Sequence, residues 1–189
     1  MVVKIGLLAL QGNVEKHSQI LLQLNFEPIL VRYREQLEQV SGLVIPGGES
    51  TTMSKLLDTT GLRQPIQTFA QQYPILGICA GLILLGNALH SDADINTFGL
   101  IDVNVTRNAY GRQLDSFVND VVVNLKDKQE TIPATFIRAP RISDIGPDVE
   151  LLASYNHEAV AVRQGRHIGL TFHPELDDVT LFHQLAFGT

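Results

Sequence analysis

The chain has 189 residues, of which 44% are hydrophobic, and a formal net charge of -6. We expect residues 1–189 to form a single domain. The acidic balance argues against a nucleic acid or an anionic membrane as partner, and no apolar run approaches the roughly 20 residues of a membrane span. Met1–Ile5 leads directly into a strand pattern, so no signal peptide is expected. A single cysteine excludes an internal disulfide and multi-cysteine zinc sites, and it suits the reducing cytoplasm.

The first half of the chain alternates apolar strands with helices. Strands are expected at Val2–Leu10, Pro28–Val31, Gly42–Ile45 and Ile75–Ile78, and helices at Gly12–Leu24, Thr51–Leu57 and Leu62–Gln72. Continuous apolar runs are typical of parallel strands that are covered on both faces. This order predicts an α/β fold with a doubly wound, mainly parallel sheet, in which ligands bind beyond the carboxyl ends of the strands.

The second half has strand patterns without long helices between them. These strands are expected at Leu100–Thr106, Phe117–Leu125, Ala134–Arg138, Glu150–Tyr155, Ala159–Arg163 and Ile168–Phe172, with a short helix at Val179–Phe187. The tripeptide Gln164-Gly165-Arg166 has the composition of a hairpin turn. We therefore predict an antiparallel ribbon or small sheet added late in the chain.

The lone cysteine, Cys79, stands between two glycines in Gly77-Ile78-Cys79-Ala80-Gly81. An apolar strand precedes this segment and an apolar helix follows it, which is the pattern of a nucleophile elbow. The start of a helix favours a thiolate, because unpaired amides and the helix dipole stabilise negative charge there. A buried, inert cysteine is the alternative, and the flanking glycines favour the nucleophile.

A thiolate nucleophile needs a base, and the segment His173-Pro174-Glu175 offers one after the last predicted strand. Proline holds the preceding residue in an extended conformation, and side chains two apart in an extended chain share a face. His173 and Glu175 should therefore lie side by side, with the carboxylate orienting the ring. The other histidines are weaker candidates; His17, in the first helix, is expected at the surface or at an interface.

The glycine-rich loop Pro46-Gly47-Gly48-Glu49-Ser50-Thr51-Thr52 ends the third predicted strand. Its main-chain amides can approach a ligand closely, and it lacks the Gly-Lys-Ser/Thr ending of a phosphate-binding Walker loop. We expect the amides of Ala80 and Gly48 to stabilise a developing oxyanion.

These motifs resemble those of the class I glutamine amidotransferases, and most closely those of the glutaminase subunits of pyridoxal 5'-phosphate synthase. The resemblance covers nearly the whole chain. It rests on Leu8–Gly12, Leu43–Thr52, Gly77–Leu85, Phe98–Asp102, Arg107–Phe117, Phe136–Pro140 and His173–Leu176. It implies a three-layer fold and a triad of Cys79, His173 and Glu175.

The resemblance also implies the remaining site residues. Glutamine would bind at Gly47, Gly48, Glu49, Arg107, Ile137 and Arg138. Gln11, at the end of the first strand, would help to set the oxyanion site, and His17 would lie at the interface with a separate synthase subunit. The expected reaction converts L-glutamine into L-glutamate and ammonia without a metal or an organic cofactor. The synthase would use the ammonia to make pyridoxal 5'-phosphate.

Three alternatives remain open from the sequence. The chain resembles glutaminases of other pathways, such as that of imidazole glycerol phosphate synthase, in its elbow and triad. A thiol hydrolase on an α/β-hydrolase-like sheet also uses an elbow cysteine. A redox-sensing or interaction domain would need the reactive cysteine but not His173.

Overall fold

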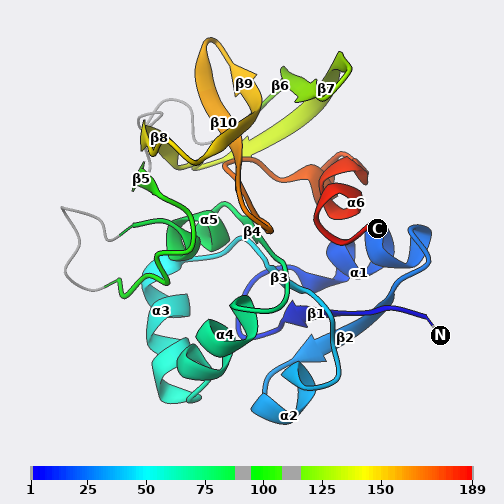
Figure 1. The fold of residues 1–189 in the computed structure, drawn as a ribbon, viewed down its shortest axis with the longest axis vertical. Helices are drawn as coiled ribbons and strands as arrows, with labels where there is room; N and C mark the ends of the chain where they lie inside the picture. The colour runs from blue at the N-terminus through cyan, green and yellow to red at the C-terminus, as the bar shows by residue number, and fades with distance from the viewer. Residues whose placement is uncertain (1, 88–94, 108–115, 189) are drawn as a thin grey trace.

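A computed structural model describes residues 2–87, 95–107 and 116–188 of the chain (Figure 1). Its strands are β1 (Lys4–Leu8), β2 (Glu27–Val31), β3 (Leu43–Ile45), β4 (Ile75–Ile78), β5 (Val103–Thr106), β6 (Ser116–Leu125), β7 (Lys128–Ile137), β8 (Arg141–Ile145), β9 (Glu150–Tyr155), β10 (Glu158–Gln164) and β11 (His167–Leu170). Its helices are α1 (Val14–Gln23), α2 (Arg34–Leu37), α3 (Ser50–Thr59), α4 (Arg63–Ala70), α5 (Ala80–Leu85), the 3₁₀ helix η1 (Pro174–Leu176) and α6 (Leu181–Phe187).

One mixed sheet runs through the molecule in the order β2-β1-β3-β4-β11-β10-β9-β6-β7. The strands from β2 to β11 are parallel to one another. β3, β4 and β11 are buried along their whole length, as the apolar runs predict for strands covered on both faces. The parallel, helix-covered half of the predicted fold is confirmed, and it carries Cys79.

Helices cover both faces of the parallel strands. Helices α1 and α6 lie together on one face, and α3 and α4 lie on the other (Figure 1). Each face has its own apolar core: Leu57, Ile66 and Leu82 belong to one, and Leu21 and Phe182 belong to the other. The part of the molecule that contains the parallel strands therefore has three layers, helix, sheet and helix.

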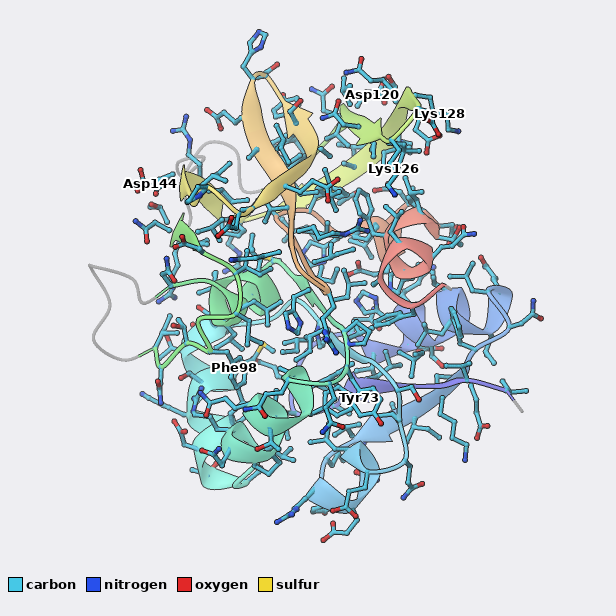
Figure 2. The ribbon with its side chains drawn as sticks, viewed as in Figure 1. Tyr73, Phe98, Asp120, Lys126, Lys128 and Asp144 are labelled. Atoms are coloured by element: carbon cyan, nitrogen blue, oxygen red, sulfur yellow. The ribbon has the colours of Figure 1, made fainter. Side chains whose placement is uncertain are left out.

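The antiparallel half extends the same sheet beyond β11. The hairpin β10–β11 turns at Gly165, whose φ of 56° suits glycine, as the sequence predicts. β6 and β7 form a long ribbon at the sheet edge, and Pro133 lies in the edge strand β7, where a missing amide donor is tolerated. Figure 2 shows the charged side chains of Lys126 and Lys128 near the outer end of this ribbon. Such charges discourage edge-to-edge association.

Outside the site, the structure differs from the sequence prediction chiefly in three elements. Helix α2 and strand β8 were not predicted, and β7 begins at Lys128 rather than at Ala134. Four residues are too few to show a helical period, and β8 and the start of β7 are largely exposed and carry few apolar residues. β5 and β8 pair only with each other, in a small second sheet.

Within the described ranges, no helix combines the length and the apolar character that a membrane crossing requires.

Candidate active site

Cys79 lies in the sharp turn between β4 and α5, with φ of 51° and ψ of -101°. Few L residues adopt this conformation, and tight packing of the flanking glycines supports it. A Cβ atom on Gly81 would lie 2.2 Å from the carbonyl oxygen of Ile45, and one on Gly77 would lie 2.7 Å from the carbonyl carbon of Gly81. The two glycines let α5 approach β3 and β4 closely, and the turn holds Cys79 at the carboxyl edge of the sheet.

The pairing of β4 with β11 brings the histidine to the cysteine. These strands are parallel neighbours, with Ile78 opposite Leu170, and the Cys79 amide donates to the Leu170 carbonyl at 2.8 Å. The chain continues past Leu170 for three residues to His173, whose amide donates to the Thr135 carbonyl at 2.8 Å. Strand pairing therefore places Cys79 and His173 at one edge of the sheet.

His173 and Glu175 form a short hydrogen bond, with 2.7 Å between Nδ1 and Oε1. The sequence predicts this contact, but the extended geometry from which we derived it is wrong. His173 precedes the 3₁₀ helix η1, and it is this turn that brings Glu175 back beneath the ring. Pro174 begins the helix, where a missing amide proton is tolerated.

The electrostatics of this pair favour an imidazolium beside a carboxylate. Burial disfavours the charged ring of His173, but hydrogen bonds with Cys79 and Glu175 outweigh this effect and raise its pKa to about 10. Burial acts to raise the pKa of Glu175, but the hydrogen bond from His173 and the electrostatic influence of His17 and His173 lower it below its usual value. A charged base of this kind stabilises a neighbouring thiolate.

A cavity of about 320 Å³ opens beside Cys79 and His173. Its lining includes the predicted site residues Gly48, Glu49, Ala80, Arg107, Ile137 and Arg138, together with Ser50 and Ile83, which the sequence analysis did not single out. The cavity has the size of a small-ligand site. Gly47, also predicted to bind substrate, is not among the lining residues; it packs against His173, because a Cβ atom there would be 2.4 Å from Cε1 of the ring.

The loop before α3 is held by its own side chains. The Glu49 carboxylate accepts hydrogen bonds from the amides of Thr51 and Thr52, at 3.0 and 2.7 Å, and so caps α3. The Thr52 hydroxyl also donates to it, and these bonds lower the pKa of Glu49 to about 2. Gln11 reaches this loop as expected from its place at the end of β1: its Oε1 accepts from the Glu49 amide at 3.1 Å.

The two arginines reach the cavity from different segments. Arg107 contacts Glu49 Oε1 and the Thr51 hydroxyl, each at 3.2 Å, so it connects β5 to the loop. Arg138 follows β7 with a φ of 41°, and the carbonyl of Ile137 lies 3.9 Å from the Cys79 sulfur. Residues 108–115 of the predicted Arg107–Phe117 motif lie outside the described residues.

The prediction that His17 lies at the surface or at an interface is wrong. Its side chain is fully buried and lies behind the triad, 3.6 Å from Glu175 Oε1 through Nε2 and 3.0 Å from His183 Nε2 through Nδ1. The helical spacing of α1 carried a signal for this burial, because His17 precedes Ile20 and Leu21 by three and four residues on the buried face, but it did not identify the partners of the ring. Sequence spacing gave no signal for His183, which lies on a different helix.

Among the residues that the structure describes, no group of three or more His, Cys, Asp or Glu side chains is arranged to hold a metal ion.

Known proteins that are similar to this chain include PdxT subunits and a glutamine amidotransferase of known structure. The chain is 46% identical over 183 residues to pyridoxal 5'-phosphate synthase subunit PdxT of Shouchella clausii, covering 96% of this chain and 92% of that protein. It is 47% identical to the PdxT subunit of Oenococcus oeni, covering 97% and 95%. A crystal structure of a glutamine amidotransferase superposes with a TM-score of 0.89 at 36% identity, covering 96% and 98%.

A more distant likeness shows the fold alone. The structure of PurLQS from Thermotoga maritima matches with a TM-score of 0.74 at 19% identity, covering 98% of each chain. The SNO glutamine amidotransferase family itself matches residues 7–187. The chain therefore belongs to the SNO glutamine amidotransferase family.

Proposed function

We propose that this chain is the glutaminase subunit of a pyridoxal 5'-phosphate synthase, and that residues 1–189 act as one glutaminase domain. The observation that carries the proposal is the meeting of Cys79 with the His173–Glu175 pair beside a small polar cavity. PdxT subunits at 46% and 47% identity favour vitamin B6 synthesis over the other amidotransferase pathways.

The proposed reaction begins when the Cys79 thiolate attacks the side-chain amide carbon of L-glutamine. The amides of Ala80 and Gly48 stabilise the oxyanion, and His173 gives a proton to the departing nitrogen, which leaves as ammonia. Water then attacks the glutamyl thioester, His173 accepts its proton, and glutamate leaves as the thiol is restored. Glu175 orients His173 through both steps.

The cavity suits the zwitterionic end of glutamine. The Glu49 carboxylate, ionised at neutral pH, offers an acceptor for the substrate's ammonium group. Arg107 and Arg138 offer guanidinium groups for its carboxylate, which an arginine can bind at two points. Charges of both signs around one small cavity favour an amino acid over a simple amide.

The ammonia would pass to a separate synthase subunit through a non-covalent interface. We propose that glutamine hydrolysis is slow until the two subunits dock, and that both work in the cytoplasm. Adding a synthase subunit from a relative's complex should raise the rate strongly, whereas equal rates with and without it would refute the gating.

The decisive experiment compares ammonia release by the wild type and by Cys79→Ala, each with the synthase subunit. The variant should lose activity by about a thousandfold or more, since no other group forms the thioester. Mass spectrometry of the wild type with glutamine should detect the glutamyl adduct on Cys79. Comparable turnover by the variant would overturn the proposal. A redox-sensing role predicts instead that His173→Ala leaves the function intact.

A further inference from the structure

Two buried histidines continue the triad from Glu175 into the core. Glu175 is 3% exposed, and His17 and His183 are fully buried. Glu175 Oε1 lies between His173 Nδ1 at 2.7 Å and His17 Nε2 at 3.6 Å. On the far side of the His17 ring, Nδ1 lies 3.0 Å from His183 Nε2. The order is thus His173, Glu175, His17, His183, leading from the cavity inwards.

Three elements build this arrangement, one from the start of the chain and two from its end. His17 comes from α1, Glu175 from η1 and His183 from α6. Helix α6 is fixed by Phe182, which packs edge-on against Phe172 with 5.5 Å between ring centroids. Its last residue, Phe187, packs over Gly42, where a Cβ atom would lie 2.6 Å from the Phe187 ring. The position of His183 beside His17 is therefore set by the surrounding packing.

The chemistry of Glu175 fixes where the protons lie. An ionised carboxylate only accepts, so we place the proton of His17 on Nε2, which faces Glu175 at 3.6 Å, just beyond hydrogen-bond distance. Burial, opposed by Glu175 and reinforced by His173, lowers the pKa of His17, so its ring is neutral and Nδ1 is an acceptor. His183 Nε2 must then donate to it. Burial also lowers the pKa of His183 well below its usual value, so this ring is neutral too.

We propose that His17 and His183 are positioning residues for the proposed glutaminase reaction: His17 directs its Nε2 proton at Glu175, and His183 holds His17 in that tautomer. The inference rests on the proposed function for its catalytic consequence. The arrangement directs a neutral N–H at Glu175 from 3.6 Å, beyond hydrogen-bond distance, so the carboxylate gains a second favourable dipole without a second cation. A neutral N–H stabilises the negative charge of Glu175. Unlike a second cation, it does not replace His173 as the charged partner of that carboxylate.

Apolar packing alone does not account for these residues. Burying an imidazole without partners costs free energy, and a leucine or phenylalanine fills the same space without that cost. Here, two imidazoles face each other at hydrogen-bond distance, and the first also faces the carboxylate of the triad. Neither histidine lines the cavity, so neither is expected to contact substrate.

The first test reads protonation in the wild-type chain. Nitrogen-15 NMR should show His17 and His183 as neutral Nε2–H tautomers at pH 7, with His173 as an imidazolium. A protonated Nδ1 on either buried ring would overturn the proposal. This measurement needs neither the synthase nor turnover, and no variant has to fold.

The second test compares His17→Phe with His17→Gln, whose amide NH₂ can replace Nε2 as donor. In the complex with the synthase subunit, His17→Phe should lower kcat by about 10- to 100-fold through misplacement of the base, with KM unchanged. It should also shift the pKa of His173. His17→Gln should recover most of both effects, and His183→Phe should shift both in the same direction as His17→Phe.

The matched control is His167→Phe, since His167 is also a buried histidine but lies at the opposite end of β11 from the triad. It should lose stability yet keep the kcat and the His173 pKa of the wild type. If His17→Phe behaves like this control, the histidines are structural and the inference fails. If instead Cys79→Ser keeps wild-type turnover, the proposed function fails, whatever the tautomers are.

Discussion

At the residue scale, the site depends on one carboxylate that serves two rings. Glu175 is buried, yet its pKa lies below the usual value, because the hydrogen bond and the electrostatic influence of the histidines outweigh burial. The same pairing keeps a proton on His173, whose pKa is about 10. Removing the negative charge of Glu175 should therefore change the protonation of the His173 ring with little effect on the fold.

Glu175→Gln tests this dependence. The amide is nearly isosteric but neutral, so the pKa of His173 should fall from about 10, and kcat should fall by roughly a thousandfold or more. Histidine NMR titration measures the first effect, and ammonia release in the complex measures the second. Glu15→Gln, on the exposed side of α1, is the control and should change neither quantity. An unchanged His173 titration would contradict the proposed pairing.

The absence of a side chain at Gly47 also determines the position of the His173 ring. A methyl group there would lie 2.4 Å from Cε1 of His173, so the ring would have to move. Gly47→Ala should reduce kcat by about a hundredfold, as expected when a reacting group is displaced by around 1 Å. Kinetics of the complex and the His173 chemical shifts measure this effect. Wild-type kinetics would show that the ring has room to adjust.

At the element scale, the sequence predicted what local patterns encode. The apolar run before Cys79 and the glycines around it predicted β4, the turn and α5, because each depends on neighbours in the chain. The pairing of β4 with β11 could not be predicted in this way, because the sequence of neither strand identifies its neighbour in the sheet. The residue types proposed His173 as the base for Cys79, but only the structure shows the strand pairing that brings the two to one edge of the sheet.

The buried histidines show the same limit. His17 and His183 are separated by 166 positions, and their contact depends on how α1 and α6 pack over one face of the sheet. Helical periodicity predicts which face of α1 is buried, but not which side chain of another helix it meets. The 3₁₀ turn at Glu175 was missed for a related reason, because the extended preference of a residue before proline says nothing of the residues after it.

Arg63 ties three segments of the helical layer together. It binds Asp58 of α3, donates to the carbonyl and hydroxyl of Ser54 at 2.8 and 3.0 Å, and donates to the Asn96 carbonyl at 2.6 Å. Arg63→Lys keeps the charge but not the planar fork that reaches all these acceptors. We expect a loss of about 1–3 kcal/mol in the free energy of unfolding, measured by urea denaturation.

Arg34→Lys is the matched control for this substitution. Arg34 pairs with Glu38 on the surface, with its side chain 72% exposed, so the change should stay within about 0.5 kcal/mol. Equal losses in the two variants would show that the network around Arg63 adds nothing to stability.

At the scale of the whole molecule, buried neutral histidines make the fold sensitive to mild acid. Burial lowers the pKa of His17, His167 and His183. The pKa of His167 falls from 6.5 to about 4. As pH falls below 6.5, the unfolded chain takes up protons that the folded chain does not, so the free energy of unfolding decreases. His173 does not contribute to the pH dependence of the free energy of unfolding in this range. Its raised pKa gives a contribution that is complete below 6.5 and is lost only as pH rises towards about 10.

The free energy of unfolding should therefore decline between pH 6.5 and about 4.5, before the carboxylates begin to titrate. His167 alone would contribute about 3 kcal/mol of the loss by pH 4, from 1.36 kcal/mol per pKa unit. His167→Asn keeps an acceptor for the Ile75 amide, which Nδ1 accepts at 3.3 Å, but removes the titrating group. Urea denaturation across this range should give a flatter pH dependence for His167→Asn than for His157→Asn, which removes an exposed imidazole by the same substitution. Parallel curves for the two variants would mean that the acid sensitivity arises elsewhere in the molecule.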